Sequence, residues 1–233
     1  MVTPWEDSVK NRNPKQLTVF ATANVKGPWR RALNDALVEF NRLSRLHNLG
    51  ITIVSPQNAT APDASNEDGE DIQFDLGSGT ITFKAFDQDF SVDNFSGTGL
   101  HGLTELVSRQ FGNQAKRARR AFIFVPENPL IEAALRIGPD NFKHIQRPVG
   151  NGIRVFIAVH EFIHACGLGG VDHTTLGPGA DILIAQPQPS AGAFNKPEDD
   201  KLLLHLAHPK PNVFSPPIFL KAPTADKIRD NWK

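Results

Sequence analysis

An apolar helix in the second half of the chain carries three ionisable side chains, and this combination limits how the chain can fold. The apolar side chains of residues 153–166 recur at helical spacing: Val155, Phe156, Val159, Phe162, Ile163 and Cys166. His160, Glu161 and His164 stand inside this pattern, and Gly167 is placed to end the helix. Because an unpaired polar group is unfavourable to bury, the fold must supply partners for these three side chains.

The spacing of the two histidines suits a metal ion. Positions i and i+4 of a helix lie on one face, so His160 and His164 can each present a ring nitrogen to one zinc ion. Glu161 lies beside His160 at an angle unsuited to ligation, where its carboxylate can take a proton from a water molecule and pass it to a leaving amine. The alternative is a core helix whose histidines are hydrogen-bonded and whose glutamate faces solvent.

The segment that follows the helix offers candidates for a third metal ligand. Gly167 allows a left-handed exit that turns the chain back, and Gly169 and Gly170 add further freedom. Asp172 and His173 come next, and a catalytic zinc ion commonly has three protein ligands and one water. We expect His173 to be the third ligand, because neutral imidazole is the commonest ligand in such sites. Asp172 is the alternative, either as a ligand or as the hydrogen-bond partner of a ligand histidine.

The remaining sequence predicts a mixture of strands and helices. Apolar runs rich in β-forming residues predict strands at 17–23, 51–54, 80–86 and 121–129, and a short apolar strand or turn at 181–189. An amphipathic pattern that starts at Pro28 predicts a helix of about five turns, ending near residue 48. Residues 96–109 are expected to begin as an extended segment and to turn helical from Thr104. A last helix is predicted at 196–207, which has acidic residues in its first turn.

Charge and composition argue against several classes of partner. The 233 residues contain 25 Lys plus Arg and 25 Asp plus Glu, so attraction to nucleic acid or to an anionic membrane is not expected. No apolar run approaches the roughly 20 residues that span a bilayer. We interpret the basic cluster Lys116, Arg117, Arg119 and Arg120 as a solvated face of the protein. Binding of nucleic acid is therefore the least favoured function.

The single cysteine and the N-terminal segment carry little functional signal. Cys166 excludes an internal disulfide framework, and we expect it to point into the core as a small apolar side chain. Residues 1–16 read as a polar arm without the basic-then-apolar order of a signal peptide. A cytoplasmic location and export, by a leaderless route or as a processed form, both remain open.

The pattern His160-Glu161-x-x-His164-x-x-Gly167 resembles the zinc signature of the metzincin metallopeptidases, and the matrixin-type members most. That family places a third histidine three residues after the glycine. In this chain Gly170 occupies that position, and His173 follows three residues later.

A second similarity lies in the passage beyond the zinc signature. The family has a methionine-containing turn beneath the zinc ion, and Leu183 stands where that methionine would be. Leucine is apolar and close to methionine in volume, so it can form the same floor of the site. In another branch of zinc peptidases a glutamate on a later helix is the third ligand, and Glu198 is the residue of this chain that could take that role.

The resemblance implies an α+β (α/β-like) fold of the zincin type. A twisted mixed sheet and two long helices would form an N-terminal lobe at 17–166, and a small C-terminal lobe would follow at 167–207. One catalytic zinc ion would lie in the cleft between the lobes. Residues 208–233 would form a proline-rich extended tail outside this 17–207 domain. The edge strand of the family pairs with an extended substrate, which implies substrate contacts along the cleft from Gly99, Leu100, His101, Gly102 and Leu103.

The function that these features favour is that of a zinc-dependent endopeptidase that uses metal-activated water, with Glu161 as the general base. Its partner would be a protein or peptide substrate, without nucleic acid or membrane, and we take a monomer as the default. The alternative is a catalytically silent zincin fold that serves as a binding or structural module. The shifted histidine and the missing methionine favour the silent module, whereas the presence of Glu161 favours activity.

The identity of the third ligand can be tested directly. His173→Ala is expected to lose most of the zinc affinity, because it removes one of the proposed ligands. Asp172→Ala is expected to keep the metal and at most to lower activity. Zinc titration of the two variants decides between them. The reverse pattern would assign the role to Asp172, and full retention by both would move the ligand elsewhere, with Glu198 the next residue to test.

Overall fold

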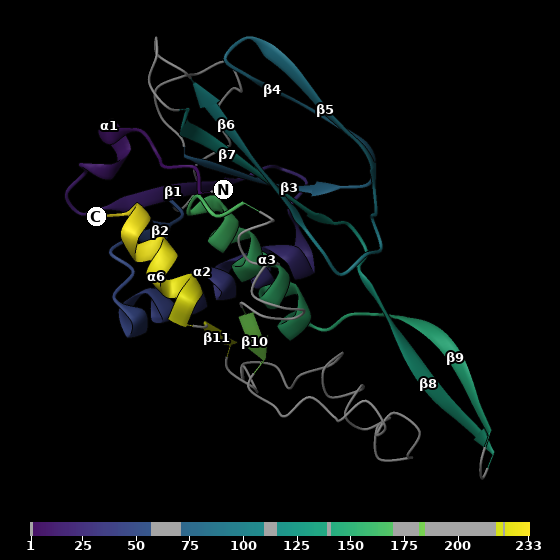
Figure 1. Cartoon of the computed structure of the whole chain (residues 1–233). Helices are drawn as coiled ribbons and strands as arrows, with labels where there is room; N and C mark the ends of the chain where they lie inside the picture. Colours follow the sequence, from purple (N-terminus) through teal and green to yellow (C-terminus); the bar gives the residue numbers. More distant parts are fainter. Residues whose placement is uncertain are drawn as a thin grey trace.

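A mixed β-sheet with two long helices on one face forms the frame of the molecule (Figure 1). The computed structural model describes residues 2–56, 71–109, 116–138, 141–169, 182–184, 218–220 and 222–233. The strands of this sheet are β1 (Gln16–Ala21), β2 (Thr52–Val54), β3 (Ile72–Gly77), β6 (Leu103–Arg109) and β7 (Arg117–Pro126). The two long helices are α2 (Gly27–His47) and α3 (Asn151–Ala165). The fold is therefore a mixed α+β arrangement, as expected.

The strand order is β2-β1-β3-β7-β6, and only β6 runs antiparallel to its neighbour. The first two strands in the chain are joined by α2, so Leu17 of β1 lies beside Ile53 of β2 in a parallel pair. Strand β7 is apolar along most of its length because both faces of the sheet are covered there. Strand β6 lies at one edge of the sheet.

The amphipathic face of α2 packs against α3 and the sheet. Its buried residues include Trp29, Ala32, Leu33, Ala36, Phe40 and Leu43. Pro28 lies in the first turn, and the helix ends at Asn48, whose φ of 52° is left-handed. Phe162 of α3 fills the space between the layers, with its ring 5.9 Å from that of Phe40 and 6.4 Å from that of Phe74. This aromatic contact positions α3 under the sheet.

A β-hairpin covers the opposite face of the sheet. It consists of β4 (Gly79–Ala85) and β5 (Gln88–Phe95). Phe83 of β4 lies 4.5 Å from the ring of Phe122 and stacks on Phe90 at 5.2 Å. Leu103 and Val107 of β6 belong to the same apolar cluster. The sheet is thus buried from both sides beside its edge strand.

A second hairpin leads from the sheet into α3. Its strands, β8 (Leu130–Gly138) and β9 (Asn141–Pro148), extend away from the rest of the molecule (Figure 1). At its base the main-chain N–H groups of Asn128 and Leu130 donate to the carbonyl oxygens of Gly97 and Thr98, at 2.9 and 3.0 Å. These bonds fix the segment that precedes β6.

The two termini meet at the C-terminal end of α3. Trp5 is fully buried and lies 6.3 Å from the ring of Trp232, which follows helix α6 (Ala222–Asn231). Trp5 Nε1 donates to the carbonyl oxygen of Ala165 at 2.8 Å, and Trp232 Nε1 donates to that of Cys166 at 3.0 Å. Asn231 Nδ2 donates to the same Cys166 oxygen at 2.8 Å. Carbonyl groups that a helix end leaves without partners are satisfied in this way.

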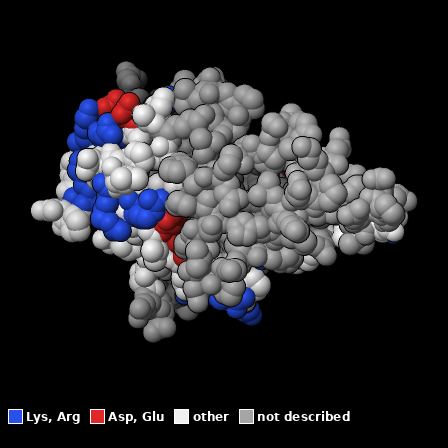
Figure 2. Space-filling view, turned by 90° about the horizontal axis from the view of Figure 1, so that it is seen from below, with Lys and Arg blue, Asp and Glu red and all other residues white. Residues whose placement is uncertain are grey.

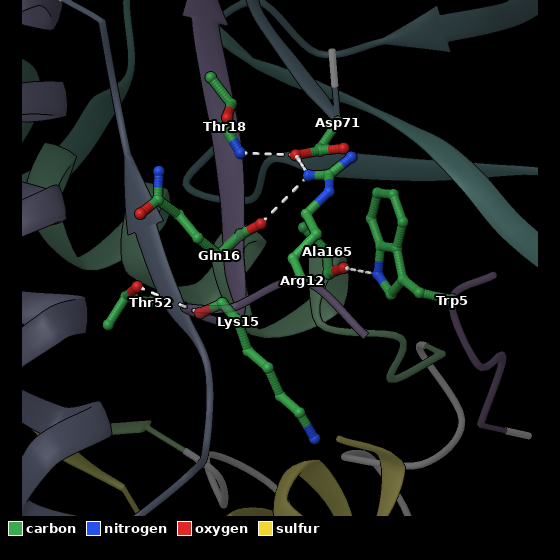
Figure 3. Close-up of polar contacts among 8 residues, drawn as sticks. All are labelled: Trp5, Arg12, Lys15, Gln16, Thr18, Thr52, Asp71 and Ala165. Atoms are coloured by element: carbon green, nitrogen blue, oxygen red, sulfur yellow. Dashed lines mark hydrogen bonds and ion pairs between the residues drawn. The ribbon is translucent and has the colours of Figure 1, made fainter. Parts of the chain in front are cut away.

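An ion pair ties the N-terminal arm to the sheet (Figure 3). Helix α1 (Asp7–Lys10) is followed by Arg12, whose Nη1 donates to Asp71 Oδ2 at 2.6 Å. The same oxygen accepts the main-chain N–H of Thr18 at 2.8 Å, and Asp71 is buried. A second bond from Arg12 Nη1 reaches the carbonyl oxygen of Gln16 at 3.2 Å. The arm is therefore an integral part of the fold.

Basic side chains gather on the side of the molecule where α6 and the C-terminus lie (Figure 2). Arg42 pairs with Glu39 at 2.7 Å, and Arg229 pairs with Asp226 at 2.6 Å. Lys15 Nζ donates to the carbonyl oxygen of Trp232 at 2.5 Å. Because acids and carbonyl groups pair with these charges, they act as local links between elements.

The strands expected at 17–23, 51–54, 80–86 and 121–129 and the long helices from Pro28 and from 153 are confirmed within a few residues. Part of 181–189 forms β10 (Ile182–Ile184), which pairs with β11 (Ile218–Leu220). The helix expected at 196–207 lies outside the described residues. No helix among the described residues is long and apolar enough to cross a membrane.

Four expectations from sequence are wrong. Residues from Thr104 continue as strand β6, because pairing with β7 satisfies their main-chain groups. The arm at 1–16 buries Trp5 and Val9 in the core. The tail at 208–233 is not extended throughout, because 222–231 form α6, whose buried side packs into the core. Arg120 of the basic cluster is buried, with its guanidinium 5.0 Å from the ring of Phe122.

The contact between the termini generates a test of stability. Trp232→Ala is expected to lower the free energy of unfolding by about 3–5 kcal/mol, because it removes a fully buried ring and leaves the Cys166 carbonyl with one donor fewer. Lys233→Ala is the control, because its side chain is exposed, and it is expected to change stability by less than about 0.5 kcal/mol. Urea denaturation measures both, and equal effects of the two variants would contradict a structural role for the C-terminus.

Candidate metal centre

His160 and His164 lie one turn apart on α3, with the Nε2 atoms of their rings directed toward each other. The two Nε2 atoms are 3.1 Å apart, and the ring centroids are 4.8 Å apart at an interplanar angle of 76°. Two nitrogen ligands about 2.05 Å from one tetrahedral zinc ion lie roughly 3.3 Å from each other. The pair of imidazoles therefore fits a zinc ion at the Nε2 side.

The orientation of His164 is set by a main-chain carbonyl group. Its Nδ1 lies 2.7 Å from the oxygen of Leu168, and since a carbonyl oxygen only accepts, Nδ1 carries the proton. In the neutral ring the unprotonated nitrogen is then Nε2, the atom that faces His160. Second ring nitrogens of metal-ligating histidines are commonly held in this way, which fixes the tautomer.

Gly167 makes the close approach of the termini possible. Its φ of 103° confirms the left-handed exit from the helix that the sequence predicts. Its N–H donates to the His164 carbonyl oxygen, and its own carbonyl oxygen accepts the N–H of Thr3, both at 2.8 Å. A Cβ atom here would collide with the Thr3 oxygen and with the side-chain amide of Asn231. The exit from α3 thus requires glycine for two reasons, conformation and space.

Glu161 is buried rather than exposed to solvent. Only 2% of its surface is accessible, so the alternative of a core helix is wrong in its solvent-facing glutamate, although both histidines are hydrogen-bonded as that alternative expects. Thr104 Oγ1 donates to Glu161 Oε2 at 2.7 Å, and the main-chain N–H of Gly102 also hydrogen-bonds to the carboxyl group. Thr104 is the second residue of β6, and Gly102 immediately precedes this strand. The edge strand and the helix therefore meet at this carboxyl group.

Burial raises the pKa of Glu161 to about 8, although the hydrogen bonds from Thr104 and Gly102 act in the opposite direction. A carboxyl group with a pKa near neutrality can both accept and return a proton under ordinary conditions. Strongly perturbed acids of this kind are enriched at functional sites.

The segment expected to bind substrate is brought to the helix in part. Gly102 contacts Glu161, and a Cβ atom at Gly102 would lie 2.6 Å from Glu161 Cγ. His101 is exposed, and Leu103 packs into the cluster under the β4–β5 hairpin. In the part of the chain that the structure describes, β6 pairs only with β7, so its outer edge carries no strand.

The remaining candidate residues are placed incompletely. Leu183 is in β10, which lies against α3. In the register of the two strands, Leu183 is paired with Phe219 of β11. Gly170, Asp172, His173 and Glu198 lie outside the described residues. Within the described ranges no group of three or more His, Cys, Asp or Glu side chains could hold a metal ion. The described part of the centre therefore consists of His160 and His164.

The ion pair of Glu39 and Arg42, which anchors β11, was not among the residues singled out from the sequence. Glu39 is buried on the apolar face of α2, and its Oε1 accepts the N–H of Ile218 at 3.1 Å. Arg42 Nη2 donates to the Ile218 carbonyl oxygen at 2.8 Å and to Glu39 at 2.7 Å. A glutamate within the apolar stripe of an amphipathic helix is the signal that could have pointed to this anchor. The pair holds the β10–β11 ribbon, and with it Leu183, beside the helices.

Cys166 is fully buried, and burial raises the pKa of its thiol. The expectation of a small apolar core residue is confirmed.

Comparison of the chain with models of protein families and with curated proteins finds no match.

The buried carboxyl group predicts a dependence of stability on pH in the metal-free protein. The pKa of Glu161 rises from 4.5 to about 8 on folding, so between these values the folded state holds a proton that the unfolded state has lost. Stability is therefore expected to fall as pH rises from about 5 to about 8, by at most about 1.4 kcal/mol per pH unit. Glu161→Gln removes this contribution. Urea denaturation of both metal-free proteins across this range measures the difference, and parallel curves would contradict the burial of an ionisable group.

Proposed function

We propose that the protein is a zinc-dependent endopeptidase that hydrolyses peptide bonds in extended protein or peptide substrates. The observation that carries the proposal is the arrangement on α3, in which two imidazoles face each other at 3.1 Å and the residue between them in the pattern supplies a buried carboxyl group. A structural zinc site needs ligands alone, whereas an adjacent proton acceptor is a requirement of hydrolysis.

His160 and His164 would hold the ion through their Nε2 atoms. The third ligand would come from the segment after Gly167, with His173 the first candidate and Asp172 the alternative. When bound, zinc supplies a Lewis acid that polarises the substrate carbonyl group and makes water acidic enough to react near neutral pH.

Glu161 would act first as the general base and then as the general acid in this reaction. Its carboxylate takes a proton from the attacking water and returns it to the amine of the leaving product. Burial, which raises the pKa of this carboxyl group in the metal-free protein, favours its protonated form and so supports uptake of the proton from water.

The edge of the sheet supports a peptide as the substrate. Strand β6 begins at the residues that contact Glu161, and its outer edge carries no strand in the described part of the chain. An extended peptide can add to such an edge through main-chain hydrogen bonds, so its scissile bond would lie near α3. The residues from Gly99 to Leu103 lead into this edge.

The fold agrees in outline with what the metzincin resemblance implies. The sheet is mixed, two long helices lie on one face, and an antiparallel strand at the edge adjoins the histidine helix. Strand β10, which contains Leu183, lies against the same helix. Burial of the Glu161 carboxyl group is unfavourable for folding, so a catalytically silent module would gain nothing from this residue.

The proposal is tested by removing the general base. Glu161→Ala is expected to lower peptide hydrolysis by at least about 100-fold and to leave about one zinc ion per chain, because Glu161 transfers protons and is not a ligand. Casein or peptide cleavage and metal analysis measure the two effects. Glu127→Gln, an exposed residue of similar charge, serves as the control and is expected to match the parent. A parent that does not cleave peptides, or a variant that cleaves as fast, would refute the peptidase.

A further inference from the structure

One hydroxyl group contacts Glu161 twice. Thr104 Oγ1 lies 2.7 Å from Oε2 of the carboxyl group and 3.2 Å from the main-chain oxygen of the same residue. Thr104 is the second residue of β6, and it faces α3 while its neighbour Leu103 faces the β4–β5 hairpin. The hydroxyl group therefore lies between the carboxyl group and the main chain of the same residue, and the shorter contact is the one to Oε2. This hydrogen bond favours the side-chain rotamers that keep Oε2 within reach of Oγ1.

Gly102 is the second neighbour of the carboxyl group. A Cβ atom at this position would lie 2.6 Å from Glu161 Cγ and 2.8 Å from both Cδ and Oε1. The side chain is therefore held between the main chain of Gly102 and the hydroxyl group of Thr104. Both contacts come from residues 102–104, where the segment expected to bind the substrate leads into β6, so the orientation of the carboxyl group depends on that segment.

A simpler explanation is that the Thr104 hydroxyl group only compensates for the unfavourable burial of the Glu161 carboxyl group. Buried carboxyl groups need hydrogen bonds, and any polar neighbour would serve. This explanation predicts that loss of the hydroxyl group changes stability alone. An orienting role predicts a change in turnover with metal and substrate binding preserved, so the two explanations are separable.

We propose that Thr104 is a positioning residue for Glu161, and that its hydroxyl group holds the carboxyl group in the orientation needed for proton transfer. The inference rests on the proposed peptidase function. It adds a requirement that the motif on α3 does not contain: the edge strand must supply a hydroxyl group at the residue that faces the base. The base is then aligned by the same strand that aligns the substrate.

Thr104→Val tests this role, because valine keeps the shape of the side chain and removes the hydroxyl group. We expect kcat to fall about tenfold, with KM and zinc affinity within about twofold of the parent, since one hydrogen bond to an ionisable group is lost. Thr104→Ser restores the hydroxyl group and is expected to recover most of the turnover. Ser108→Ala, which removes a hydroxyl group from the same strand, is the matched control and is expected to behave as the parent.

A spectroscopic measurement supplies a readout apart from activity. The infrared band of the Glu161 carboxyl group can be assigned in the metal-free protein by difference from Glu161→Gln. We expect this band to shift in Thr104→Val and to return in Thr104→Ser. Gly102→Ala provides a second variant if Thr104→Val fails to fold, because the added Cβ atom displaces the carboxyl group and leaves the hydroxyl group in place. It is expected to lower kcat and to retain zinc.

Several results would overturn the proposal. Unchanged turnover and an unchanged carboxyl band in Thr104→Val would show that the hydroxyl group does not orient Glu161. An equal loss in Thr104→Ser, or a loss of zinc in Thr104→Val, would show that the variant disturbs the strand or the metal centre instead. If the parent itself cleaves no peptide, the proposed function fails, and the carboxyl band alone then decides whether Thr104 orients Glu161.

Discussion

The burial of the Glu161 carboxyl group is the constraint on which the arrangement of the site depends. A carboxyl group with 2% of its surface exposed must be hydrogen-bonded, and its partners here are Thr104 and Gly102. Strand β6 therefore has to begin against α3, and Gly102 has to lack a side chain. The same requirement places the start of β6, an edge strand in the described part of the chain, against the helix that carries the two histidines. One buried polar group, the candidate base itself, thus joins the edge strand to α3.

The C-terminal end of α3 depends on a second set of polar contacts. The indole groups of Trp5 and Trp232 satisfy the carbonyl groups of Ala165 and Cys166, and Gly167 lets the N-terminal arm pass close by. The next carbonyl group, that of Leu168, fixes the ring of His164. The two ends of the chain thereby pack around the segment whose Leu168 carbonyl group holds the ring of His164. The orientation of the histidine is a property of the whole fold rather than of the helix.

The spacing of apolar residues along the sequence predicts the helices correctly where the helical period dominates. The helix from Pro28 and the helix with His160 and His164 have long apolar stripes, and both were predicted within a few residues. The pattern failed at residues 103–107, where Leu103, Leu106 and Val107 stand at helical spacing but form a strand. Pairing with β7 decided this case, because main-chain hydrogen bonds and a hairpin on one face outweigh a short helical pattern.

The sequence by itself determined that two histidines share a helix face, that an acid adjoins them, and that a glycine ends the helix. Each of these features follows from the 3.6-residue period or from the backbone freedom of glycine. Only the tertiary structure decided that Glu161 is buried, that Thr104 and Gly102 are its partners, and that Leu168 orients His164. Those contacts join residues up to about sixty positions apart, and their formation depends on the packing of β6 and of both termini around α3. Local spacing can place two histidines on one helix face, but the partners of the buried carboxyl group between them in the sequence come from elsewhere in the chain.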